Sequence, residues 1–188
     1  MFTREETYNL LKKYTKSQSL IKHALAVEAA MRGYAKKFNE DVEFWGITGL
    51  IHDVDYELYP EKHPYEGVKI LKESGYPEEL IDAVKGHADL TNTPRQTLLA
   101  KTLYAVDELS SFIIAYILVR PNKSFEGIKL KSIKKKLKDK AFARAVDRDL
   151  INRAAEELGV ELDEHIMTVV EALVEREKEL NQIAESLV

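Results

Sequence analysis

Two carboxylates occur in this sequence where an ordinary solvent-exposed position is not expected. Asp53 follows His52 directly at the end of the apolar run 47–51, and Asp107 lies within a stretch, 103–113, that is apolar almost all round. Burying an unpaired carboxylate is very costly, so each side chain needs a cation or hydrogen-bond donors. A bound metal ion would satisfy both.

His23 adds a third segment to such a site. It lies in the middle of a helical pattern, and Ala26 and Ala30 on the same face allow another helix to approach closely. His23, His52, Asp53 and Asp107 together would form a mixed nitrogen and oxygen site, which suits Mn, Fe, Co, Ni or Zn, with Mg as a further candidate. The chain has no cysteine, which excludes thiolate ligands and a cysteine nucleophile.

The segments that must position these residues are all expected to be helical. Apolar residues recur at helical spacing, and no segment alternates in the manner of a strand. Thr3 and Glu6 form a capping box, Asp41 can cap a third helix, and Pro64 suits a first helical position. We expect helices over about residues 3–14, 17–38, 41–51, 64–75, 77–86, 97–119, 131–137, 147–158 and from 163 onward.

The composition is that of a globular protein. The chain has 188 residues, of which 45% are hydrophobic and 32% charged, enough for one domain with a core. We therefore predict the all-α class and a single compact helical domain over 1–188, with a core at 17–119 and a basic segment plus C-terminal helices at 120–188.

Two features bear on location. The N-terminus is charged and lacks the apolar run of a signal peptide. The apolar stretch 97–119 contains Lys101, Asp107 and Glu108, so a buried helix is expected instead of a membrane span. We expect a cytoplasmic protein that does not bind membranes.

The order of the four candidate ligands resembles the HD superfamily of metal-dependent phosphohydrolases. The resemblance covers about residues 20–112 and places the family's first His at His23, its His-Asp doublet at His52 and Asp53, and its last Asp at Asp107. It implies an HD-type helical fold and an enzyme that hydrolyses a phosphoester or phosphoanhydride by metal-activated water. The implied substrate is a nucleotide or another small phosphorylated compound.

Two further histidines extend the resemblance. His63 and His87 lie between the doublet and the last Asp, as in the branch of the superfamily that binds two metals. In that branch Asp53 would bridge the ions, and His63 and His87 would hold the second ion. The implied cofactor is therefore one or two divalent metal ions.

The residues after the doublet depart from the commoner family pattern. Many members have a small residue and then Lys or Arg, whereas this chain continues with Val54-Asp55-Tyr56-Glu57. The missing cation leaves open how a phosphate is bound. Besides Asp53, the candidate catalytic residues are Asp55 and Glu57, which could act as general acid or base or orient water.

Positive charge is concentrated in residues 120–148, which contain eleven Lys or Arg and three acids. Such segregation favours an anion-facing patch, although a lysine run is more often a solvated helix face. The candidate phosphate-binding residues are Arg120, Lys123, Lys131, Lys134 and Lys135. Aromatic residues that stack on bases are sparse there, so no specific nucleic-acid binding is expected.

Two other functions stay open. One is a non-catalytic, nucleotide-sensing or partner-binding module with a structural metal, and the other is a di-iron oxygenase, which the two-metal branch also resembles. Apolar residues of the terminal helix, such as Leu173 and Leu180, could support a homodimer. His165, at the edge of an apolar stripe, is expected to be a boundary residue without function.

Overall fold

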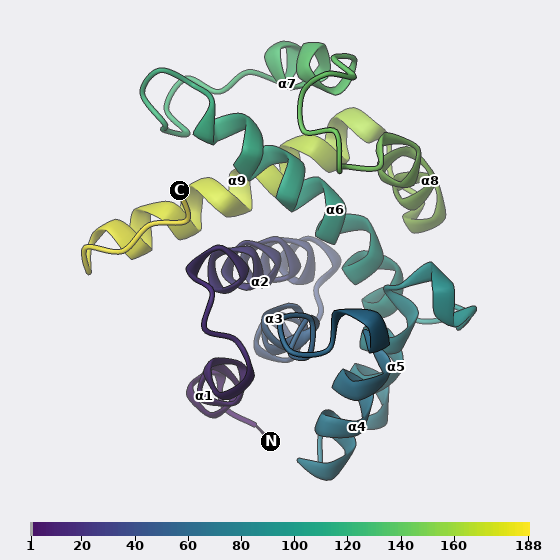
Figure 1. Cartoon of the computed structure of the whole chain (residues 1–188). Helices are drawn as coiled ribbons and strands as arrows, with labels where there is room; N and C mark the ends of the chain where they lie inside the picture. Colours follow the sequence, from purple (N-terminus) through teal and green to yellow (C-terminus); the bar gives the residue numbers. More distant parts are fainter. Residues whose placement is uncertain (1) are drawn as a thin grey trace.

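The computed structural model describes residues 2–188, and within this range it contains nine α-helices and two short 3-10 helices but no strand (Figure 1). The prediction of the all-α class is confirmed. The α-helices are α1 Arg4–Tyr14, α2 Gln18–Phe38, α3 Val42–Ile51, α4 Tyr65–Glu73, α5 Glu78–Gly86, α6 Leu98–Leu118, α7 Leu130–Leu137, α8 Arg148–Leu158 and α9 Leu162–Asn181.

Capping residues place most helix ends close to their predicted positions. The capping box of Thr3 and Glu6 opens α1, and the Asp41 carboxylate accepts the backbone N–H groups of Glu43 and Phe44 at the start of α3. Pro64 differs from the prediction, because it is the residue before α4 instead of the first helical residue.

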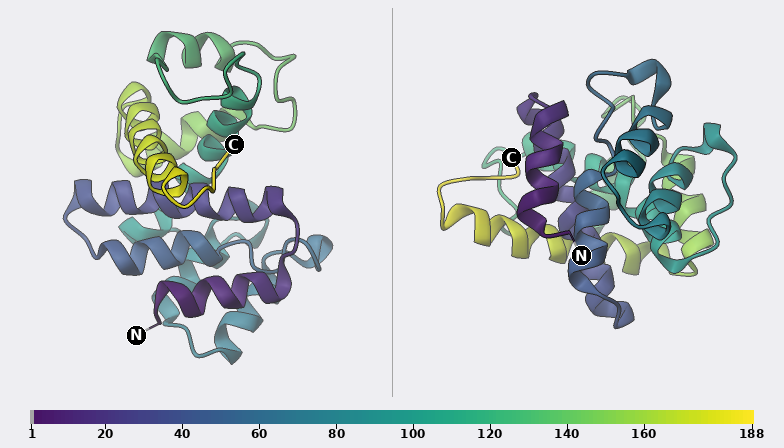
Figure 2. Two further views of the ribbon diagram at one scale, coloured as in Figure 1. Left: turned by 90° about the vertical axis from the view of Figure 1, so that its left-hand side faces the viewer. Right: turned by 90° about the horizontal axis from the view of Figure 1, so that it is seen from below.

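Helices α1, α3 and α2 lie in a stack (Figure 2, left), and a glycine sets the separation of α2 and α3. A Cβ atom on Gly49 would lie only 2.8 Å from Met31 Cγ and 2.9 Å from the Val27 carbonyl oxygen. Any larger residue would push the two helices apart. The close approach brings the end of α3, where His52 lies, beside the middle of α2, where His23 lies.

Helix α6 is central and contacts α2, α5, α8 and α9. Its apolar surround is therefore explained by burial among other helices, as expected for a segment that carries Asp107. Among residues 2–188, no helix combines the length and the hydropathy that crossing a membrane would require.

His165 of α9 lies in the core, so its prediction as a boundary residue was wrong. The side chain is fully buried, the Tyr34 hydroxyl lies 2.6 Å from His165 Nδ1, and His165 Nε2 lies 3.0 Å from the Ala105 carbonyl oxygen. Burial lowers the pKa of His165 to about 4, against the raising effect of the Ala105 hydrogen bond. This neutral histidine ties α9 to α2 and α6.

The residues after α9 fold back toward the start of α2 (Figure 2). Leu187 is fully buried, and the Lys22 ammonium donates to the Val188 carbonyl oxygen at 2.8 Å. This C-terminal segment, residues 182–188, forms one wall of a cavity described below.

Candidate metal centre

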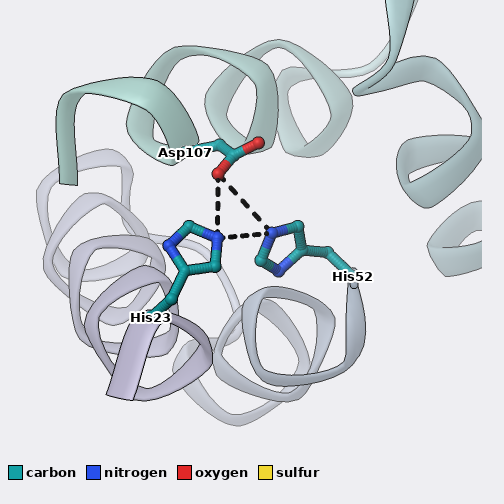
Figure 3. A group of neighbouring side chains, drawn as sticks. All are labelled: His23, His52 and Asp107. Carbon is teal, nitrogen blue, oxygen red and sulfur yellow. Dashed lines mark hydrogen bonds and ion pairs between the residues drawn. The ribbon is translucent and has the colours of Figure 1, made fainter. Parts of the chain in front are cut away.

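Three side chains from three helices meet in the interior of the bundle (Figure 3). His23 from α2 and His52 from the end of α3 place their Nε2 atoms 3.2 Å apart. Asp107 Oδ1, from α6, lies 3.2 Å from His23 Nε2 and 3.5 Å from His52 Nε2. Donor atoms of one tetrahedral site with bonds of roughly 2.1 Å lie about 3.4 Å apart, so these spacings suit a single ion.

Asp53 joins this set to a second one. Its Oδ2 atom lies 3.5 Å from His23 Nε2 and 3.4 Å from His52 Nε2. Its Oδ1 atom faces the other way, 3.5 Å from His63 Nε2 and 3.3 Å from His87 Nε2, and these two nitrogens are 3.1 Å apart. One carboxylate therefore contributes an oxygen to each of two groups of donor atoms.

The four histidines are held so that Nε2 points into the cluster. In each ring the other nitrogen, Nδ1, has a hydrogen-bond partner outside the cluster, which fixes the ring orientation and leaves Nε2 free for a metal. The partners are the Ser111 hydroxyl for His23, the Gly49 carbonyl for His52, the Asp55 carboxylate for His63 and the Val84 carbonyl for His87.

These residues fit divalent metal ions. The donors are imidazole nitrogens and carboxylate oxygens, and three-residue sets of the right spacing occur twice, as His23, His52, Asp107 and as His52, Asp53, His87. Such donors suit first-row transition metals. Five of the six side chains, all except Asp107, are at least four-fifths buried, so their charge needs a bound ion or a proton to balance it.

The cluster holds its carboxylates in the charged form that a metal requires. Burial would raise the pKa of Asp53, but the charge of His52 and hydrogen bonds from the histidines keep it well below the usual range. The same balance lowers the pKa of Asp107. In turn, hydrogen bonds to Asp107 and Asp53 outweigh burial and raise the pKa of His23 to about 9. Protons and metal ions therefore compete for these nitrogens.

An open cavity of about 530 Å³ gives access to the cluster. Besides five of the six candidate ligands, its walls include Tyr56, Asp89, Glu108, Ser111 and Leu150. Ser111 and Glu108 are not among the site residues predicted from the sequence. Ser111 lies four residues after Asp107 on the same helix face, a spacing that could have pointed to it.

Neither Asp55 nor Glu57 lies where a general acid or base could reach a substrate in the cavity. Asp55 is fully buried, and its two oxygens accept the His63 imidazole and the Gly67 backbone N–H, each at 2.7 Å. It has no access to a substrate proton and instead orients His63. The Glu57 carboxylate accepts the backbone N–H groups of Lys16 and Ser17 at 2.8 and 2.9 Å and does not line the cavity.

The predicted phosphate-binding residues do not line the cavity either. The Arg120 guanidinium donates to the backbone carbonyls of Ser124 and Glu126, and Lys134 pairs with Asp163 at 2.6 Å. Lys123, Lys131 and Lys135 are exposed beyond the end of α6. That end lies eleven residues past Asp107, about 16 Å along the helix at 1.5 Å per residue. Of the described residues that line the cavity, none is Lys or Arg.

Comparison with known proteins concerns the same part of the chain. Residues 20–111 match the family model of the HD domain. Ribonuclease Y of Nitratidesulfovibrio vulgaris strain Hildenborough is 31% identical over 98 residues, which cover 50% of this chain and 18% of that protein. Ribonuclease Y of Thermus thermophilus is 29% identical over 97 residues, which cover 50% of this chain and 17% of that protein. The chain thus spans less than a fifth of these relatives, and no solved structure matches it significantly.

Proposed function

We propose that this chain, which matches the HD domain family over residues 20–111, is an enzyme that hydrolyses a phosphoester or phosphoanhydride of a small phosphorylated compound with divalent metal ions. The observation that supports this proposal most strongly is the shared carboxylate of Asp53. One of its oxygens faces His23 and His52, and the other faces His63 and His87, at 3.3–3.5 Å.

We propose that the centre takes two ions of the Mn, Fe, Co, Ni or Zn type. Bound ions of this kind lower the pKa of water and polarise a phosphoryl oxygen. His23, His52, Asp53 and Asp107 would hold one ion, and Asp53, His63 and His87 the other. Residues of both sets line the cavity, and the second set has three protein donors against four, so its ion would leave more room for water or a substrate.

The remaining residues act by positioning. Asp55 fixes the ring of His63, and Ser111 fixes the ring of His23. Glycine at position 67 allows the Asp55 carboxylate to reach the start of α4, because a Cβ there would lie 2.9 Å from Asp55 Oδ1. Since no Lys or Arg lies among the described cavity residues, the substrate phosphate must be bound mainly through the metal centre.

RNA is a second candidate substrate, favoured by the names of the two relatives, which are ribonucleases. The exposed lysines beyond α6 would suit a polyanion. The cavity itself argues for a smaller substrate, because none of its described lining residues is Lys or Arg and the arginines nearest to Asp89 are already paired with it.

The proposal is tested by phosphate release from the metal-loaded protein. We expect turnover of p-nitrophenyl phosphate or bis(p-nitrophenyl) phosphate, loss of that turnover with a chelator, and recovery with Mn, Fe or Co. The Asp107→Asn variant should be inactive under the same conditions. Oxygen uptake without phosphate release, or metal binding without any turnover across a panel of phosphate esters, would contradict the proposal.

A further inference from the structure

A second cavity, of about 480 Å³, adjoins the metal centre. It shares Ser19, His23 and Ser111 with the cavity described above, so the two cavities adjoin each other at the ring of a candidate metal ligand. We name it the apolar groove, and it is lined by Gln18, Ser19, Lys22, His23, Ser111, Ile114, Ala115, Leu118, Leu187 and Val188.

The wall of the groove on α6 is an apolar stripe that begins at the metal centre. Ser111, whose hydroxyl contacts His23, is followed on the same helix face by Ile114, Ala115 and Leu118, at intervals of three, four and seven residues. Leu118 is 45% exposed, so the far end of the stripe is only partly covered by the protein. On the opposite side, buried Leu187 of the C-terminal segment closes the groove.

The groove offers an anion very little. Lys22 is the one Lys or Arg among its described lining residues, and its ammonium already donates to the Val188 carbonyl at 2.8 Å. In the cavity next to it, Asp89 is already paired with Arg95 and Arg153, and Glu108 has no Lys or Arg beside it among the described lining residues. A second phosphate would therefore meet the Glu108 carboxylate on one side and hydrocarbon on the other.

From these observations we infer that the substrate is a phosphate monoester of an apolar alcohol, with the phosphate at the metal centre and an aryl or alkyl group in the apolar groove. The inference rests on the proposed function, which supplies the phosphate end. A volume of about 480 Å³ lies within the usual range of small-molecule sites, roughly 300–1,000 Å³. Burial of the apolar group would supply the affinity that absent cations cannot.

The test compares ethyl phosphate with 2-phenylethyl phosphate, whose leaving groups have similar reactivity, on metal-loaded protein. We expect a KM for 2-phenylethyl phosphate that is lower by roughly ten- to hundred-fold, as for burial of an apolar ring. The Ala115→Phe variant fills the groove and should bring the ratio of the two KM values close to one. Leu118→Gln, at a half-exposed position, should reduce that ratio with less risk to folding. Ala141→Phe, at an exposed site beyond α7, is the matched control and should leave the ratio unchanged.

Binding of non-hydrolysable analogues separates this inference from the proposed function. By calorimetry, 2-phenylethylphosphonate should bind more tightly than ethylphosphonate to the wild type and to Ala141→Phe, but not to Ala115→Phe. Discrimination in binding, with no hydrolysis of either ester or of the nitrophenyl phosphates used above, would overturn the proposed function and leave the groove as a ligand site. Hydrolysis with equal KM values, or stronger competition by tripolyphosphate or an RNA oligonucleotide than by 2-phenylethylphosphonate, would overturn the inference.

Discussion

The metal centre and the basic segment at residues 120–148 are both rich in ionisable side chains, but these side chains converge only in the metal centre. Six charged or imidazole side chains of the first converge, with neighbouring donor atoms 3.1–3.5 Å apart. In the second, Lys134 pairs with Asp163 of α9, and Arg120 and Arg148 donate to backbone carbonyls of their own segment. A charged side chain that is buried among apolar residues needs a group of opposite charge or a hydrogen-bond partner. A charged side chain on a solvated face does not, and its contacts need only support the local structure.

We expect the largest effect from the replacement of Asp53 by Asn. An amide cannot supply negative charge to both donor sets, so we expect loss of bound metal and of phosphate release to the level of the metal-free protein. Metal analysis and a phosphate assay measure both, and far-UV circular dichroism reports the helix content. Asp82→Asn, at an exposed position of α5, is the matched control and should retain both properties. Wild-type turnover in Asp53→Asn would remove the basis of the contrast.

The buried His165 side chain predicts that the stability of the fold depends on pH. The pKa of this side chain is about 4 in the folded state against 6.5 for an ordinary histidine, because burial disfavours its charge. The unfolded chain therefore binds the extra proton first, and stability falls as the pH drops from about 6.5 to 4, by about 3 kcal/mol. The positive charge of the nearby Lys37 ammonium also lowers this pKa.

Urea unfolding of the wild type and of His165→Gln at several pH values measures this contribution. The free energy of unfolding of the variant should change less over this pH range, because the titrating group is gone. Parallel pH curves for the two proteins would show that His165 does not carry the effect.

Much of this fold and of its metal centre could be predicted from the sequence, because helical periodicity and charges in apolar segments are visible there. Helical periodicity and the caps at Thr3 and Asp41 gave the helices, and the misplaced charges of Asp53 and Asp107 pointed to a shared partner. The burial of His165 could not be predicted, because the partners Tyr34 and Ala105 are far from it in sequence. The same holds for Asp55, since only the folded loop shows that both its oxygens are occupied.

Asp55 and Glu57 are two residues apart, but only Asp55 contacts a candidate metal ligand. Asp55→Asn weakens the hold on His63, and we expect a loss of about 10- to 100-fold in activity or in affinity for the second metal equivalent, as for other residues that orient a metal ligand. Metal titration followed by a phosphate assay measures this loss. Glu57→Gln, which alters the contact with the backbone before α2, should keep the wild-type metal affinity. Equal metal affinities for the two variants would contradict the positioning role of Asp55.

The smallest effect is expected on the other side of the comparison. Lys131→Ala combined with Lys135→Ala removes two exposed charges of α7, and we expect unfolding free energy within about 0.5 kcal/mol of the wild type and an unchanged KM. Steady-state kinetics at low ionic strength gives the most sensitive check. A tenfold rise in KM would show that Lys131 and Lys135 contribute to phosphate binding.

We propose that one chain holds two metal ions through the shared carboxylate of Asp53. This proposal is tested most directly by the metal content per chain of protein that was purified without chelator and without a metal-binding tag, measured by mass spectrometry. We expect about two equivalents in the wild type and about one in His63→Ala and His87→Ala. One equivalent in the wild type that is unchanged in both variants would contradict the second site and limit the centre to His23, His52, Asp53 and Asp107, and no bound metal after addition of Mn, Fe or Zn would contradict both sites.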